Sequence, residues 1–93
     1  MKYRLRPVEI EAIQWTGDNR GEIEKFCGWE NTMFYHYLDK NIIQIHLQIN
    51  TLKGWTRANH GDYIVKGIHG EFYPCEEDIF NETYEKVEKR VTL

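Results

Sequence analysis

The sequence predicts a single α+β domain over residues 1–93, with a mainly antiparallel, strongly bent sheet, one helix in its N-terminal half and a short helical turn late in the chain. Three observations carry this prediction. Apolar and polar residues alternate in several short segments, most clearly in 42–50. Residues 19–27 carry apolar side chains at helical spacing. The 93 residues, 41% of them hydrophobic, fit one core, and no linker, repeat or low-complexity tract divides the chain.

The first segment, Lys2 to Trp15, is predicted to form a strand. Its apolar and acidic residues alternate, which places them on opposite faces of an extended chain. The alternation changes phase at Ala12 and Ile13, as it does at a bulge. This long strand is therefore expected to bend.

A short helix is expected to follow the turn at residues 16–19. Asp18 or Asn19 can cap the free amides of its first turn, and Glu22 lies three residues after Asn19. Gly28 is suited to end the helix, because glycine readily adopts the left-handed conformation found there. The expected buried stripe comprises Ile23, Phe26 and Cys27.

The rest of the chain is rich in aromatic and β-branched residues, which favour strands. Extended segments are predicted over residues 32–38, 42–50, 53–58, 63–66 and 71–74, with turns at 39–41, 59–62 and 67–70. In 42–50, the core face is predicted to carry Ile43, Ile45, Leu47 and Ile49. A helical turn is expected over 75–81, and a last alternating segment, 84–91, could pair with the first strand.

One helix cannot cover both faces of such a sheet. Either the sheet closes on itself as a partly open barrel, or a second subunit covers the remaining surface. The chain has three tryptophans and six tyrosines, and aromatic residues are enriched at interfaces. The composition therefore favours a homo-oligomer.

Charge and hydropathy exclude several classes of protein. Lys and Arg number 12 against 15 Asp and Glu, whereas a protein that tracks a nucleic-acid backbone needs a cationic surplus, so no general nucleic-acid binding is expected. No apolar run approaches the ~20 residues of a membrane span, and residues 1–7 do not read as a signal peptide. We therefore expect a cytoplasmic protein with no membrane partner. Cys27 and Cys75 are expected to be free thiols, because they belong to no Cys-x-x-Cys pair.

Two stretches of the chain resemble a group of small bacteriophage and prophage proteins. The first is KYR, PV and EAIQWTGDN within residues 2–19, and the second is GDYIVKG, GEFYPC, DIF and TY within residues 61–84. The second stretch is similar to a region labelled by a Pro-Gly-Asp-Tyr-Gly motif, although His60 stands at the place of its proline and Ile64 at the place of its last glycine. The resemblance implies a phage origin and action in a bacterial host, and it implies no particular chemistry.

The sequence predicts neither a metal site nor catalysis. His60 with Asp62, and His69 with Glu71, are the candidate metal ligands, but none of the usual ligand spacings is present. Cys75 with either histidine could be a nucleophile and base, yet spacing alone establishes no geometry. The chain has no Gly-rich phosphate loop and no Gly-x-Ser-x-Gly motif. We expect a protein that is not an enzyme and needs no cofactor.

Binding of an anion is the better-supported chemistry. Helix amides after residues 16–19 could receive a phosphate beside a stacking Trp15, although a side-chain cap and a core tryptophan would explain the same residues. Arg57 and Lys66 flank the turn at 59–62 and could bracket an anion near Tyr63, although solvated sheet charges would look alike. The predicted ligand-binding residues are Trp15, Thr16, Arg57, Tyr63, Lys66 and Tyr73.

Two functions fit these features. The leading hypothesis is a non-catalytic phage protein that assembles as a homo-oligomer and sequesters a small anionic ligand, such as a nucleotide signal of bacterial anti-phage defence. It rests on analogy with phage proteins of similar size. The alternative is a protein-interaction module that inhibits or adapts a host or phage protein through a strand edge or an aromatic patch.

Overall fold

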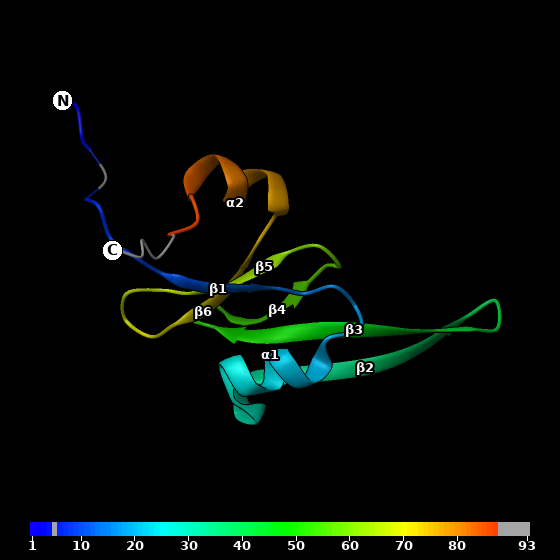
Figure 1. Ribbon diagram of the computed structural model, residues 1–93. Helices are drawn as coiled ribbons and strands as arrows, with labels where there is room; N and C mark the ends of the chain where they lie inside the picture. Colours follow the sequence, from blue (N-terminus) through cyan, green and yellow to red (C-terminus); the bar gives the residue numbers. More distant parts are fainter. Residues whose placement is uncertain (5, 88–93) are drawn as a thin grey trace, which may run out of the picture.

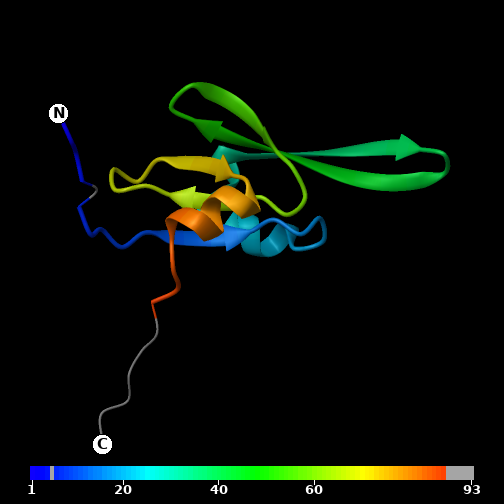
Figure 2. The same ribbon diagram turned by 90° about the horizontal axis from the view of Figure 1, so that it is seen from above.

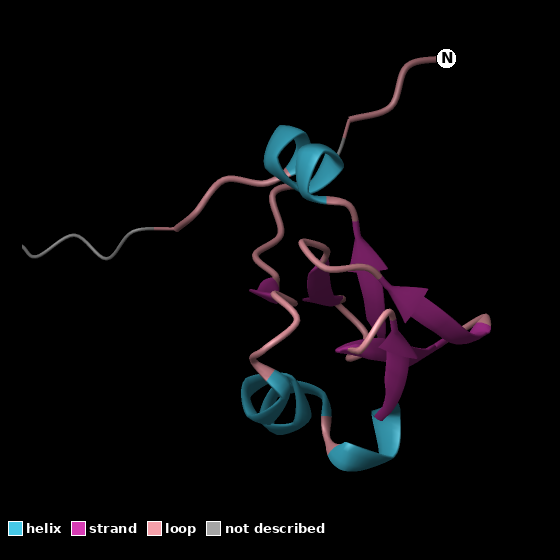
Figure 3. Ribbon diagram, turned by 90° about the vertical axis from the view of Figure 1, so that its right-hand side faces the viewer, coloured by secondary structure: helices cyan, strands magenta, loops and turns pink. Residues whose placement is uncertain are grey.

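The computed structural model describes residues 1–4 and 6–87 and confirms the α+β class. Its strands form two three-stranded antiparallel sheets, ordered β1-β5-β6 and β2-β3-β4, and they do not close into a barrel (Figure 1). Within the described residues, the elements in chain order are β1 (Glu11–Gln14), α1 (Arg20–Cys27), the 3-10 turn η1 (Trp29–Asn31), β2 (Thr32–Asp39), β3 (Ile42–Thr51), β4 (Gly54–Ala58), β5 (Tyr63–Lys66), β6 (Phe72–Cys75) and α2 (Glu77–Thr83). The helices α1 and α2 lie at opposite ends of the molecule, with the strands between them (Figure 3).

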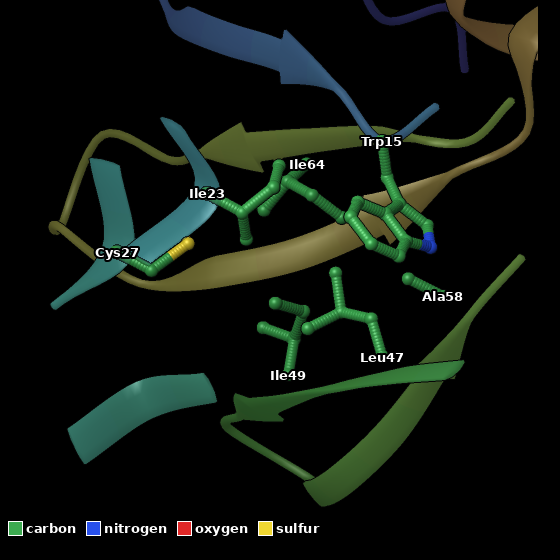
Figure 4. Packing of buried hydrophobic residues seen from close by; sticks show 7 residues of the cluster. All are labelled: Trp15, Ile23, Cys27, Leu47, Ile49, Ala58 and Ile64. Atoms are coloured by element: carbon green, nitrogen blue, oxygen red, sulfur yellow. The ribbon is translucent and has the colours of Figure 1, made fainter. Parts of the chain in front are cut away.

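The core lies where α1 and the two sheets meet. The α1 stripe is confirmed, because Ile23 and Cys27 are buried and Phe26 packs against them from its partly buried position. Each element contributes the apolar face that its own periodicity defines. The fully buried cluster of Figure 4 comprises Trp15, Ile23, Cys27, Leu47, Ile49, Ala58 and Ile64.

The predicted first strand is too long. Only Glu11–Gln14 is strand, and it pairs with β5 from Glu11 opposite Lys66 to Gln14 opposite Tyr63. Residues 1–4 and 6–9 are exposed and lie outside any strand, because no neighbouring strand reaches them to pair with their backbone. The predicted last strand is absent over residues 84–87, and the remainder of it lies outside the described residues.

The hairpin of β2 and β3 extends far beyond the core. Lys40 and Asn41 form its two-residue turn, with φ of 50° and 66°. Because β4 pairs with β3 only as far as Leu47 opposite Ala58, residues 35–46 form a two-stranded arm that projects from the molecule (Figure 2). The prediction that Ile43 lies in the core is wrong, since 68% of its surface is exposed. The apolar alternation of β3 continues past the point where there is a core to face.

At the end of the molecule opposite α1, α2 packs on the β1-β5-β6 sheet through aromatic contacts (Figure 3). The Phe80 ring stacks on that of Tyr63 with a centroid separation of 3.9 Å, and Tyr84 packs against Phe80 at 5.1 Å.

Across residues 1–4 and 6–87, we find no helix of the length and apolar character that a membrane crossing requires.

Candidate anion-binding site

A small polar hollow of about 80 Å³ lies where β4 ends beside β3. Its walls follow from the topology. After Ala58 the chain leaves the sheet and turns toward β5, while β3 continues into the arm without a neighbour on that side. The notch left by the departing strand is lined by Gln44, His46, Arg57, Ala58, Asn59 and His60.

The polar walls of this hollow come from the outer face of the sheet. Leu47 of β3 and Ala58 of β4 are buried, so the residues next to them along each strand, His46 and Arg57, point to the opposite face. Gln44 precedes His46 by two residues and shares this face, and its Oε1 atom lies 3.4 Å from His46 Nε2. The strand alternation therefore brings an imidazole, a guanidinium and an amide side chain to one place.

His60 also lines the hollow, and its ring is held from two sides. Its Nε2 atom lies 2.9 Å from the carbonyl oxygen of Ile45, so the N–H group donates to the free edge of β3. The ring also packs edge-on against Trp15, with centroids 5.6 Å apart. In the neutral ring this leaves Nδ1 as an acceptor, and in the protonated ring Nδ1 becomes a second donor.

The electrostatics of the hollow favour an anion. Arg57 carries a permanent charge, and two imidazole rings line the hollow beside it. None of the six lining residues is an aspartate or a glutamate. The volume suits a group the size of a phosphate, since a water molecule takes roughly 30 Å³ in the liquid. An isolated cation would find no carboxylate there.

Exposed aromatic rings continue from the hollow along the arm. Tyr37 stacks on His46 with centroids 5.7 Å apart and an interplanar angle of 28°, and 56% of its surface remains exposed. Tyr35 lies on the same face, where its hydroxyl donates to Gln48 Oε1 at 3.0 Å. Two tyrosine rings thus adjoin the polar hollow on the outer face of the arm.

A second, larger cavity of about 380 Å³ lies between the β3–β4 turn and β6. Its walls are mainly apolar, with Leu52, Phe72 and Tyr73 among them. It offers one cation, Lys53, and one carboxylate, Glu71, so it has no preference for an anion. Burial, with a smaller contribution from the neighbouring Tyr84 hydroxyl, raises the pKa of Tyr73 to about 12, so its phenol is neutral at physiological pH.

The structure separates the predicted ligand-binding residues. Arg57 lines the polar hollow and Tyr73 lines the apolar cavity. Trp15 has no exposed surface, so its indole has no free face on which a ligand could stack. Tyr63 is half-buried under Phe80, and Lys66 is exposed at the end of β5.

The turn before α1 is closed by its own side chains. Asn19 occupies the N-cap position, yet no side chain caps the helix, so that expectation is wrong. The Asn19 carboxamide instead accepts from the Thr16 backbone N–H at 2.9 Å and donates to the Gln14 carbonyl at 2.7 Å. The Thr16 hydroxyl is engaged with Asp18 and Asn19. These local bonds compete with capping, as is usual for asparagine in a turn.

Sequence reasoning missed most of this hollow. His46 and Gln44 stand on the polar face of the segment that alternates most clearly, and Arg57 stands on the next strand. That placement was visible in the sequence, but the register that brings Arg57 beside His46 was not. The sequence suggested His60 only as a metal ligand or as the base for a Cys75 nucleophile.

Other chemistry receives little support from the described residues. No group of three or more His, Cys, Asp and Glu side chains converges where a metal ion could bind, as judged over residues 1–4 and 6–87. The Asp62 carboxylate accepts from the Asn59 backbone N–H at 2.9 Å, and the Glu71 carboxylate accepts from that of His69 at 3.1 Å. Burial, with smaller contributions from Asp62 and Glu76, raises the pKa of Cys75, which disfavours the nucleophilic thiolate. Comparison of the chain with protein-family models, with curated proteins and with solved structures returned no match.

Proposed function

We propose that this is a non-catalytic, homo-oligomeric binding protein that sequesters a small anionic ligand of the nucleotide class. The observation that carries the proposal is the convergence of Arg57, His46 and His60 on a phosphate-sized hollow that no acidic residue lines. Arg57 can give a phosphate two parallel hydrogen bonds, and a ring N–H of His46 can add a third. The hollow binds the charged group and leaves the rest of the ligand outside it.

The exposed rings beside the hollow suit the other half of a nucleotide. The Tyr37 ring, which is already stacked on His46, can receive a base on its outer side. Stacking depends little on base identity. The phosphate and the base would therefore both add affinity, and the protein would accept nucleotides with different bases. Tyr37 thus takes the stacking role that the sequence predicted for Trp15.

The predicted fate of the ligand is release without reaction. Binding stabilises the ligand in the hollow, and the thiol of Cys75 is not among the residues that line it. The resemblance of the sequence to small phage proteins makes a nucleotide signal of bacterial anti-phage defence the first ligand to test, in the cytoplasm of the host. A protein of this kind acts by lowering the free concentration of the signal.

The test is a set of thermal shifts and calorimetric titrations with inorganic phosphate, mononucleotides and cyclic dinucleotides. We expect a nucleotide to raise Tm, and Arg57→Ala to weaken its binding by at least tenfold, the usual scale for a charge-assisted pair. Lys66→Ala is the matched control, because it removes an exposed strand cation outside the hollow and should bind as the wild type does. Tyr37→Ala should weaken nucleotide binding and leave phosphate binding unchanged.

Recovery of the ligand completes the test. Mass spectrometry after denaturation should return the nucleotide with its mass unchanged. The proposal fails if none of these probes shifts Tm, if Arg57→Ala binds as tightly as the wild type, or if the recovered nucleotide has been cleaved.

A protein-interaction module that inhibits or adapts a host or phage protein is the second candidate. The projecting arm favours it, because Leu38 and Ile42 remain 66% and 62% exposed on opposite faces of the hairpin. Such a module predicts a stoichiometric partner in a pull-down from infected cells. Binding should then depend on these apolar residues and be indifferent to Arg57→Ala.

A further inference from the structure

We propose that the β2–β3 arm is an interface with a second copy of this chain, formed by antiparallel pairing of β2 with β2 of the partner about a two-fold axis at Tyr35. This inference specifies the homo-oligomer of the proposed function, and it does not depend on ligand binding. A two-stranded hairpin is marginally stable alone in water, and residues 35–46 pair with no third strand among the described residues.

Both faces of the arm carry exposed apolar side chains near its far end, although Asp39 and Gln44 share one of these faces. Leu38 pairs with Ile43 on the face that continues from the core, and Tyr37 and Ile42 lie on the other face. The five large exposed side chains of the arm, including Tyr35, retain 40% to 68% of their surface. Three of them, Tyr35, Tyr37 and Leu38, belong to β2, the strand whose edge is free.

The outer edge of β2 is free to pair. The two-residue turn closes on the hydrogen-bonded pair of Asp39 and Ile42, and bonded and non-bonded pairs alternate from there. The backbone groups of Phe34, His36 and Leu38 therefore point away from β3. The hydrogen bond from His60 supports this alternation. It reaches the carbonyl of Ile45, which lies opposite His36 in a non-hydrogen-bonded pair, so that carbonyl also points away from the neighbouring strand of the hairpin. The β2 edge also lacks the usual protection, since Thr32–Asp39 contains no lysine and no proline.

One antiparallel register makes this edge self-complementary. With Tyr35 opposite Tyr35 of the partner, the two rings occupy the close, non-hydrogen-bonded position, where aromatic pairs stabilise a sheet. Met33 then faces the partner's Tyr37, so the same face is apolar along its length. In this register the hairpin turn that carries Lys40 lies next to the start of the partner's β2, where the preceding η1 turn carries Glu30. A two-fold axis repeats this pair of opposite charges.

A second copy suits this surface better than an unrelated protein does. The hairpin turn carries the cation Lys40 and the η1 turn of the partner carries the anion Glu30, while Asp39 at the end of β2 lies toward the uncharged Asn31 of the partner. Shifting the register by one hydrogen-bonded step in either direction separates Lys40 from Glu30. The chain thus carries both halves of one interface, as an isologous dimer requires.

Charge reversal tests both the partner and the register. Size-exclusion chromatography with light scattering and native mass spectrometry should show a dimer of the wild-type chain. Lys40→Glu and Glu30→Lys should each weaken the dimer by about tenfold, because each places two pairs of like charges across the axis. An equimolar mixture of the two variants should recover a heterodimer, since both of its contacts then join opposite charges. This recovery also shows that both variants fold.

A stronger break and its control complete the experiment. Tyr35→Glu sets two carboxylates face to face at the axis and should give a monomer at micromolar concentration. Trp55→Glu changes another exposed aromatic residue on the same sheet face, but on β4, and should leave the dimer intact. An oligomer that resists Tyr35→Glu overturns this interface and leaves the homo-oligomer possible elsewhere. A wild-type chain that stays monomeric, or whose arm binds only an unrelated protein, overturns both.

Discussion

The imidazole of His60 joins the free edge of β3 to the core, because its Nε2 atom lies 2.9 Å from the Ile45 carbonyl oxygen while its ring packs against Trp15. One side chain therefore caps the strand edge at the point where β4 leaves it. The same contact shapes the polar hollow and separates the core from the arm. It links the stability of the fold to the geometry of the candidate site.

Replacing this histidine should cost stability through two separable effects. We expect His60→Ala to lower the free energy of unfolding by about 1–2 kcal/mol, from the lost hydrogen bond and the lost ring contact. His60→Phe retains a ring and should recover part of that loss. His69→Ala, in an exposed turn, is the control and should change stability by less than about 0.5 kcal/mol. Urea denaturation measures all three, and equal effects at both positions would contradict this role for His60.

The backbone at Gly17 is constrained by the same ring. Gly17 has a φ of 97°, and a Cβ atom placed there would lie 2.8 Å from His60 Cε1. Gly54 has a similar φ of 101° with open space around it. Both Gly→Ala changes should be destabilising by about 1–2 kcal/mol for the conformation alone, and Gly17→Ala by a further amount for the clash. In a His60→Ala background the difference between the two should shrink, and a double-mutant cycle would show it.

Trp15 is a core residue, and we expect its replacement to destabilise the fold. Its side chain is fully buried between α1 and the sheets, and its Nε1 atom has no hydrogen-bond partner among the described residues. Trp15→Ala should cost about 3–5 kcal/mol, a large share of the stability of so small a domain. Trp15→Phe should cost clearly less, because it keeps a ring and removes the unpaired donor. Chemical denaturation followed by circular dichroism would measure both, and a small effect of the alanine change would contradict this assignment.

The two thiols should differ in reactivity and in their effect at alkaline pH. Burial raises the pKa of Cys27 to about 12 from an ordinary value of 9.0. The unfolded chain therefore releases this proton first as pH rises. The free energy of unfolding is unaffected by this thiol below about pH 9 and falls between about pH 9 and 12, at up to about 1.4 kcal/mol per pH unit. Cys27→Ala should flatten the decline in that window.

Alkylation at neutral pH tests independently whether Cys27 is buried and Cys75 is more accessible. Iodoacetamide should modify Cys75, which is half-buried, faster than Cys27, which is 4% exposed. In urea the two rates should converge. Faster modification of Cys27 in the native protein would show that α1 opens more readily than its packing indicates.

Local patterns predicted much of the fold because they depend on neighbours in the chain. The helix at 19–27 was found at Arg20–Cys27, and the segment 63–66 coincides with β5. The strand at 32–38 and the Asp39–Asn41 turn were also placed correctly, since β-branched and aromatic residues favour extended chain and short polar runs favour turns. The first and last segments failed because a strand needs a partner, which alternation alone does not supply.

The candidate site was predictable only in part. Arg57 stood out as a strand cation next to a turn, but it was expected to bracket an anion near Tyr63 together with Lys66, whereas it lines the polar hollow without either of them. Its neighbours His46 and Gln44 come from another strand, and only the pairing of Gln48 with Arg57 brings them together. Trp15 and Thr16 looked like ligand-binding residues because burial and the local bonds of a turn are not visible in a sequence.

By itself, the amino-acid sequence determined the elements of this protein: the helix, most strands, the tight turns and the side of each strand that is apolar. Tertiary structure decided where the apolar side meets a core and where it meets solvent. The alternation of β3 is uniform, yet Leu47 is buried and Ile43 is exposed, because the body of the domain ends between them. Periodicity is a property of the chain, whereas burial depends on what the rest of the molecule places opposite each residue.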